Sequence, residues 1–429
     1  MDSNTTFKKR RFLHKDTIAM FGPAWLVMMA DMDASSYIGA AQTGATLGYG
    51  LIWLMLILII PLYVVQELAG RISIATREGL GDIVRKNYGK RMAMLVAMPM
   101  ALTDMVTYAI EYLGIGIGLE IMGLSIFYTL PVIYLIHILI VTRKRYRQAE
   151  KPLLIISFFL IIALLLSLSL RGIIPVSSPL ANPILIKPTA GYFFLLAANV
   201  GAVIMPFMIF FQASATGLKL KDIENREIIT HFHRRRRSPR RRRSPRRNYK
   251  IPEGPVAINK HRSVIIMRKE TLVGAIVTEL LMVIAEMAFA GIPRAAHASF
   301  FATPQLLGKV LTPVAGSLSP YVLGIGLIAA GFIALITISL GSAWGIAESL
   351  NISKKSYWLV YILESLPAII AIMFVNPSSM IALVLYLLIF FVFTLVAPMT
   401  MLWLIGRNKE IMGDLVLSRK NELVYIAMF

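Results

Sequence analysis

Long apolar stretches separated by short basic loops run through most of this chain. Ten of them are long enough to cross a bilayer as helices or nearly so. The pattern predicts spans over residues 18–45, 51–68, 92–122, 126–141, 153–170, 192–218, 271–290, 321–346, 357–375 and 380–405. A last apolar stretch, 423–429, is too short to cross and is interpreted as the start of a possible truncated eleventh span.

Composition agrees with this pattern. The chain has 429 residues, 57% of them hydrophobic, and a mean hydropathy of +0.70, which is outside the range of ordinary soluble proteins. The sequence therefore predicts an all-α polytopic membrane protein. The absence of cysteine excludes disulfides and thiolate metal sites. No nucleophile–base pair, phosphate-binding loop or zinc-ligand spacing stands out, so we expect neither an enzyme nor a bound cofactor.

The charged residues divide the chain into five parts. These are a basic N-terminus (1–16), spans 1–6 (17–218), a basic low-complexity loop (219–270), spans 7–10 (271–405) and a tail (406–429). When the spans alternate across the bilayer, the lysine- and arginine-rich loops all fall on the side of the N-terminus. The positive-inside rule makes that side cytoplasmic. We expect a multi-pass protein of the plasma membrane.

Nearly half of the net charge of +21 comes from one segment, because ten arginines lie between Arg234 and Arg247. This segment repeats Arg-Arg-Arg-Arg-Ser-Pro and is expected to be disordered in water. Three interpretations are open: a solvated insert, a contact with anionic lipid headgroups, or a contact with nucleic acid or an acidic protein. Nucleic acid is the least favoured partner because no aromatic residues interleave with the arginines.

The middle of span 1 is polar. Asp31 and Asp33 lie in the stretch from Ala30 to Ser36, with two serines and no basic residue. A carboxylate at bilayer depth costs roughly 2.5–3.5 kcal/mol on insertion scales. The stretch indicates either a substrate site at a break in the helix or a patch of hydrogen bonds between helices.

Span 6 carries Pro206 at its centre, which predicts a kink or an opening near Ala202. Spans 1 and 6 hold matching positions in two halves of five spans each. Two interrupted helices in corresponding positions are typical of inverted-repeat transporters with a site at the bilayer midplane. An ordinary proline kink is the alternative for span 6.

The residues at these interruptions suit a cation. Asp33 and Ser36 offer oxygen ligands one helical turn apart, and opened backbone offers carbonyls near Ala30 and Ala202. Met205 offers a thioether, which favours softer transition metals, or else packs in the core like other methionines.

These residues resemble the natural resistance-associated macrophage protein (Nramp) family of divalent-metal transporters. Its first-span motif, Asp-Pro-Gly-Asn, matches Asp-Ala-Ser-Ser at 33–36, followed by Gln-Thr-Gly-Ala at 42–45. Its sixth-span motif matches Ala-Val-Ile-Met-Pro-Phe at 202–207, and Glu-x-x-Gly matches Glu111 and Gly114. The resemblance implies a LeuT-type fold of two inverted five-span repeats and alternating access. It also implies metal ligands at Asp33, Ala202 and Met205.

Three departures bear on what is transported. Ser36 replaces an asparagine, Phe207 replaces a histidine, and Tyr108 stands where an acidic residue is expected. The last two positions belong to the family's proton route, which argues against proton coupling. The altered first motif resembles the magnesium-transporting branch, whereas Met205 resembles the manganese and iron branch. We expect Mn²⁺ to be favoured, with Mg²⁺ close behind.

Other intramembrane polar residues are candidates for the pathway or for coupling, namely Glu111, Glu279 and Thr394. Two rival functions stay open. The chain could be a transporter of the same fold for an organic solute such as an amino acid, although Asp33 would repel a carboxylate. It could also be a membrane anchor for the arginine-rich loop.

Overall fold

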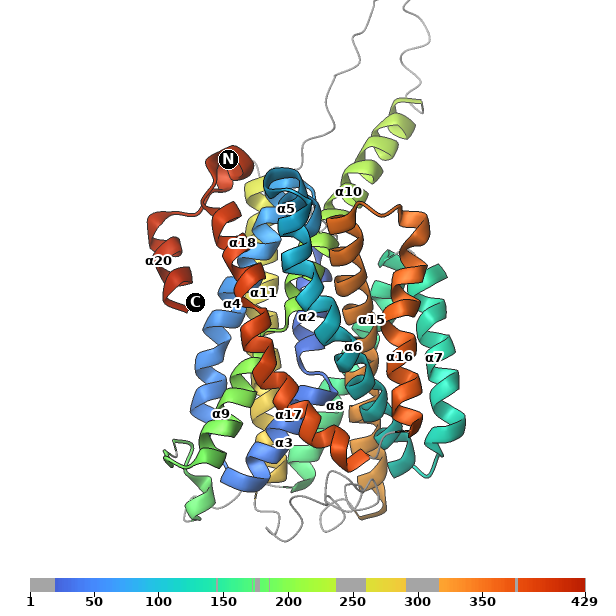
Figure 1. The fold of residues 1–429 in the computed structure, drawn as a ribbon, viewed down its shortest axis with the longest axis vertical. Helices are drawn as coiled ribbons and strands as arrows, with labels where there is room; N and C mark the ends of the chain where they lie inside the picture. The colour runs from blue at the N-terminus through green and yellow to red at the C-terminus, as the bar shows by residue number, and fades with distance from the viewer. Residues whose placement is uncertain are drawn as a thin grey trace, which may run out of the picture.

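The computed structural model describes residues 20–143, 146–171, 173, 178–184, 186–236, 260–290, 316–374 and 377–428. The regular elements in these ranges are all helices (Figure 1). Eight of the described helices are long and apolar enough to cross a membrane, and a shorter apolar helix covers Ile126–Thr142. With the interrupted first span these account for the ten predicted spans.

Eight of the predicted spans, the second to fifth and the seventh to tenth, correspond to separate helices or helix pairs. They are α4 (Ile52–Thr76), α6 (Lys90–Ile121), α7 (Ile126–Arg143), α8 (Tyr146–Arg171), α11 (Lys260–Phe289), α15 (Ser319–Leu350), α16 (Tyr357–Phe374), and α17 (Pro377–Thr394) followed by α18 (Val396–Gly406). Shorter helices flank them: α5 (Leu80–Tyr88), α19 (Lys409–Met412) and α20 (Arg419–Met428).

Spans 1 and 6 are each broken into two helices. Span 1 consists of α2 (Pro23–Asp31) and α3 (Ala34–Leu47), and span 6 of α9 (Ala190–Val203) and α10 (Pro206–Arg236). Both interruptions were predicted, but the second lies at residues 204–205 rather than near Ala202. The reason is that α10 begins at Pro206, whose fixed φ suits the first position of a helix.

The halves of the broken helices pair across the bundle. Figure 1 shows α2 and α10 toward one end and α3 and α9 toward the other, and α2 contacts α10 while α3 contacts α9. Asn199 of α9 donates a hydrogen bond of 2.7 Å to the hydroxyl of Thr43 in α3. The two interruptions therefore come together inside the bundle.

Helices α6 and α15 form the most extensive packing in the described chain. Their crossing depends on glycine at both sides: a Cβ on Gly118 would lie 2.7 Å from the Gly324 carbonyl, and a Cβ on Gly324 would lie 2.7 Å from the Gly118 carbonyl. The backbones approach too closely for any side chain, as at small-residue helix interfaces in membranes.

The loop predicted over 219–270 is shorter than expected. α10 continues to Arg236 and α11 already begins at Lys260. An ion pair of 2.7 Å between Glu224 and Arg77 holds the extension of α10 against the end of α4. Three arginines of the arginine-rich segment end α10, and the remainder, from 237 on, lies outside the described residues.

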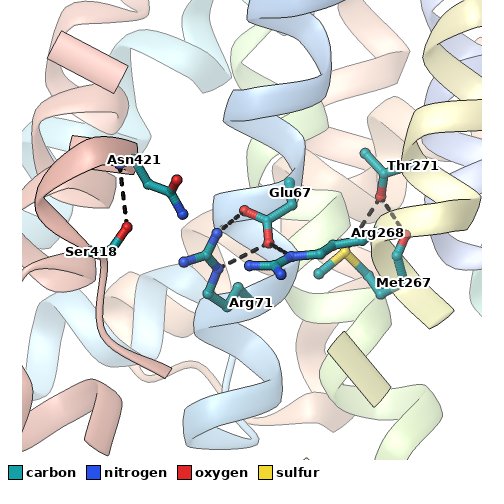
Figure 2. Close-up of polar contacts among 7 residues, drawn as sticks. All are labelled: Glu67, Arg71, Met267, Arg268, Thr271, Ser418 and Asn421. Atoms are coloured by element: carbon teal, nitrogen blue, oxygen red, sulfur yellow. Dashed lines mark hydrogen bonds and ion pairs between the residues drawn. The ribbon is translucent and has the colours of Figure 1, made fainter. Parts of the chain in front are cut away.

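An ionic cluster joins α4 to α11 (Figure 2). Glu67 accepts hydrogen bonds from Arg71 Nε at 2.9 Å and from Arg268 Nε at 2.6 Å, and it also pairs with the Arg71 Nη2 group. Buried carboxylates are stable when they are paired and hydrogen-bonded in this way. Glu67 is thus an example of a buried acid with a structural role, because its charge is paired with two arginines.

Candidate functional site

Asp33 lies at the break of span 1 and caps the helix that follows. It is fully buried, and its Oδ1 accepts hydrogen bonds from the Ser36 amide at 2.7 Å and the Ser35 hydroxyl at 2.6 Å. Aspartate is a preferred N-cap residue because its side chain satisfies the free amides of the first turn. Its second oxygen, Oδ2, has no hydrogen-bond partner among the described residues. One carboxylate oxygen therefore fixes the side chain while the other is available to a ligand.

Two backbone carbonyls at the breaks lose their usual helical donors. Ala30 would receive the amide of Ala34, but that amide donates to Glu111 Oε2 at 3.0 Å. Ala202 would receive the amide of residue 206, which is a proline and has no amide hydrogen. Both carbonyls lie at the ends of half-helices, where the helix dipole attracts positive charge.

The side chains of Ser36 and Met205 complete the sequence-predicted set. Both are fully buried, and the Ser36 hydroxyl has no hydrogen-bond partner in the described ranges. The Met205 amide contacts the Met208 sulfur at 3.4 Å. Phe207 is also fully buried, so the position where the family motif has a histidine is occupied by an apolar ring.

Glu111 connects α6 to the break of span 1. Its Oε2 accepts the Ala34 amide, and its Oε1 has no partner among the described residues. The close approach of α6 to α3 requires Gly114, because a Cβ there would lie 2.3 Å from the Cβ of Ala34. The Glu-x-x-Gly pattern thus has a geometric role, in which Gly114 admits α3 and Glu111 binds its first amide.

One acid of α11, Glu279, lies near the break of span 1. Glu279 is fully buried and neither of its oxygens has a hydrogen-bond partner in the described chain. Asp31, at the end of α2, is equally unpartnered and lies within electrostatic range of Glu279 and Asp33. Glu286 differs, because its Oε1 accepts the Leu51 amide at 3.0 Å.

The remaining candidate, Thr394, is less well connected. It ends α17, which packs against α3 and α9, and its hydroxyl donates to the Phe391 carbonyl of its own helix at 3.0 Å. The structure thus places Thr394 on a neighbouring helix without joining it to Asp33 by a described contact.

A separate polar cluster lies between α6, α7, α15 and α16. His137 contacts the Tyr112 hydroxyl at 2.6 Å and the Ser339 hydroxyl at 2.7 Å, so both ring nitrogens are bonded. Tyr108 donates to Ser339 at 2.9 Å. Glu364 accepts the Ser342 hydroxyl at 3.1 Å. These contacts agree with a packing role for His137 and with hydrogen bonding between helices for Glu364.

Sequence reasoning missed the anchor of α2. Glu270 of α11 accepts the Gly22 amide at 2.7 Å and the Trp25 amide at 2.9 Å. Lys219 of α10 donates to the Phe21 carbonyl at 3.0 Å and also pairs with Glu150. The one signal in the sequence was an acid, Glu270, next to a predicted span. That signal does not identify the backbone amides that the acid binds.

Across the described residues, no three His, Cys, Asp or Glu side chains come together as a metal-binding group. A cation at the breaks would therefore need a mixed set of donors, with one carboxylate oxygen of Asp33, hydroxyl and carbonyl oxygens, and a thioether. Such a set is weaker than an all-carboxylate cage, as transport requires, because the ion must also leave.

A comparison with models of protein families shows which family matches this chain. The family model for natural resistance-associated macrophage protein-like sequences matches residues 24–429.

The chain belongs to the Nramp family.

The match includes both broken helices and confirms the resemblance read from the motifs around Asp33 and Met205. Two curated relatives are divalent metal cation transporters named MntH from Klebsiella pneumoniae, one from subsp. pneumoniae strain ATCC 700721 / MGH 78578 and one from strain 342. Each is 26% identical over 211 residues, which is 48% of this chain and 51% of the relative. The aligned part of this Nramp chain therefore spans about half the length of these relatives.

Solved structures agree on the fold. The manganese transporter of Eremococcus coleocola, in complex with an aromatic bis-isothiourea substituted compound, superposes with a TM-score of 0.76 at 15% identity, covering 96% of this chain and 84% of that one. A mutant of the same transporter gives a TM-score of 0.75, covering 97% and 85%. This likeness confirms the predicted all-α, LeuT-type fold with broken helices 1 and 6.

Proposed function

We infer that this Nramp family member is a secondary transporter that moves divalent metal ions across the membrane by alternating access. One observation carries the proposal. At the break of span 1, Asp33 is buried and held by Ser35 and Ser36, and its Oδ2 has no partner in the described chain. A fixed, dehydrated carboxylate oxygen beside freed carbonyls is an arrangement that stabilises a cation.

The donors proposed for the metal are Asp33, Ser36 and Met205 with the carbonyls of Ala30 and Ala202. Oxygen ligands accept Mg²⁺ and Mn²⁺ alike, and the thioether adds a preference for the softer ion. We therefore propose that Mn²⁺ is favoured and that Mg²⁺ is close behind. The names of the Klebsiella and Eremococcus proteins, a divalent metal cation transporter and a manganese transporter, support this class of substrate.

Two positions of the family's proton route carry other residues in this chain, which argues against proton coupling. Phe207 is an apolar ring in the core, and Tyr108 is a neutral donor to Ser339. Neither can take up a proton in the manner of the histidine and the acid that the family motif has there. We propose that these two positions do not conduct protons in this chain.

The membrane orientation follows from charge. Basic residues concentrate on the side of the N-terminus, which we propose to be cytoplasmic, in the plasma membrane. The alternation of the predicted spans assigns the arginine-rich segment to the same side, and we propose that it contacts anionic lipid headgroups. Because none of the proposed metal ligands lies in this segment, deleting residues 234–247 should leave metal uptake largely intact.

Uptake into proteoliposomes tests the proposed function. Purified protein is reconstituted into vesicles that contain a dye quenched by Mn²⁺, and the initial rate is compared for the wild type, Asp33→Asn and Asp82→Asn. The control makes the same chemical change at an acid in α5, paired with Arg85. Loss of a metal ligand should lower the rate at subsaturating Mn²⁺ by about tenfold or more. Equal rates for Asp33→Asn and the wild type would refute the assignment, and uptake of amino acids without Mn²⁺ would favour the organic-solute alternative.

A further inference from the structure

Asp31 and Glu279 form a second buried acidic pair beside the break of span 1. Asp31 ends α2 and is 1% exposed, and Glu279 lies within α11 and is 0% exposed. The two helices pack against each other, and the carboxylates lie within electrostatic range of one another. All four of their oxygens lack hydrogen-bond partners among the described residues. The proposed metal ligands make no use of either side chain.

This pair differs from the other buried acids that surround α2 and α11. Glu270 accepts two backbone amides, and Glu67 is flanked by two arginines. The charged side chains that act on Asp31 are both acids, Glu279 and Asp33. Charged buried carboxylates without a cation or donors are unfavourable, so the pair is stable when it is protonated or when a bound cation supplies the positive charge that the described part of the protein does not.

The end of α2 adds to the negative potential at this point. The helix stops at Asp31, and the Ala34 amide that would cap the Ala30 carbonyl is bound to Glu111 instead. The carbonyl end of a helix attracts cations, and unwound carbonyls at half-helix ends coordinate them in transporters. The two carboxylates and the end of α2 thus lie in the same part of the interface between α2 and α11.

We propose that the carboxylates of Asp31 and Glu279 form a second cation position, which shares the carbonyl end of α2 with the position between Asp33 and Met205. The position takes a hard divalent cation such as Mg²⁺ or Ca²⁺. Two carboxylates balance the charge of a divalent ion, whereas a monovalent ion would leave a net negative charge buried. The assigned donors are all oxygen atoms, which favour hard cations over soft ones such as Cd²⁺.

The proposal rests on the proposed function in one respect, namely that this chain handles divalent cations. The test therefore reads the two positions separately. Thermal unfolding of the purified full-length protein is followed in detergent, with and without Mg²⁺, in an Asp33→Ala background that removes the main ligand of the other position. Mg²⁺ should still raise the Tm of Asp33→Ala by about 2 °C or more, and the shift should disappear in Asp33→Ala/Glu279→Gln.

The matched control is Asp33→Ala/Glu286→Gln. It makes the same substitution seven residues further along α11, at an acid whose Oε1 already accepts the Leu51 amide, and it should keep the Mg²⁺ shift. Glu279→Gln should fold, because it removes an unpaired buried charge. Cd²⁺ should stabilise the wild type and lose most of its effect in Asp33→Ala.

Three results would overturn the proposal. If the wild type responds to Mg²⁺ and Asp33→Ala does not, the second position does not exist, while the proposed function stands. If Asp33→Ala/Glu279→Gln keeps the Mg²⁺ shift, the assigned residues are wrong. If the wild type responds to none of Mg²⁺, Mn²⁺ and Cd²⁺, the proposed function fails together with this inference.

Discussion

Replacing Gly114 by alanine should weaken metal binding, because the added methyl pushes α3 away from α6 next to Asp33. The new Cβ would lie 2.3 Å from the Cβ of Ala34, whereas ordinary van der Waals contact begins at 3.4 Å. The first turn of α3 must therefore move by about 1 Å relative to α6, since packed cores have no free space to absorb the overlap.

The displacement acts on the residues that position Asp33. The hydrogen bond from the Ala34 amide to Glu111 measures 3.0 Å, and lengthening it by about 1 Å takes it out of bonding range. Overpacking costs about 1–3 kcal/mol of folding free energy, and the gain from replacing a helical glycine by alanine offsets about 0.5–1 kcal/mol of it. Loss of a contact that orients a metal ligand typically costs about 10–100-fold in metal affinity, which is the effect we expect on the Kd for Mn²⁺.

Calorimetric titration of Mn²⁺ into purified protein measures this effect, and a second substitution tests its cause. In Gly114→Ala/Ala34→Gly the clashing methyl of Ala34 is gone, and the nearest remaining atom of residue 34, its Cα, lies at 3.7 Å from the new Cβ. The double variant should recover most of the affinity. Gly191→Ala is the control, because no atom lies within 4 Å of its added Cβ. An unchanged Kd in Gly114→Ala, or no recovery in the double variant, would refute the reasoning.

Two further substitutions probe the same site, and a third probes the anchor at the start of α2. Ser35→Ala removes the hydroxyl that holds Asp33 Oδ1 at 2.6 Å and should raise the Kd for Mn²⁺ about tenfold; an unchanged titration would show that the capped amide alone fixes the carboxylate. Met205→Ala should weaken Cd²⁺ and Mn²⁺ binding while leaving Mg²⁺ binding nearly unchanged, because only the thioether is lost. If competition titrations show the same loss of affinity for all three ions, Met205 has a packing role instead. Glu270→Ala leaves two amides at the start of α2 without their acceptor and should destabilise the protein by about 1–3 kcal/mol, which lowers its Tm. Glu270→Gln keeps an acceptor oxygen and should lower the Tm less. Identical Tm values for the two variants would contradict an anchoring role.

The helical framework was predictable because the hydrophobic effect and the bilayer thickness act locally along the chain. Each apolar stretch became a helix, and the two breaks lie where Asp33 and Pro206 interrupt the pattern. The helices extend further than the apolar stretches indicated, as α10 does to Arg236, because beyond the membrane a helix is limited by its polar contacts. The ion pair between Arg77 and Glu224 is such a contact, and it joins residues far apart in the sequence.

The residues of the candidate site were predictable only where a residue stands out in the sequence by itself. An acid in an apolar stretch and a proline within a span stand out in the sequence, so Asp33 and the break before Pro206 were found. The partners of these groups were not predictable, because they depend on which helices pack together. Examples are the bond from Ala34 to Glu111, the anchor at Glu270 and the proximity of Asp31 to Glu279.

The central claim is that the two broken helices hold one metal ion between Asp33 and Met205. Anomalous diffraction from crystals of the full-length protein soaked in Mn²⁺ tests it most directly, with Asp33→Asn crystals as the comparison. We expect an anomalous peak within bonding distance of Asp33 Oδ2 and near the Met205 sulfur, and we expect no such peak in Asp33→Asn. A peak that persists unchanged in Asp33→Asn, or Mn²⁺ bound only away from both breaks, would contradict it.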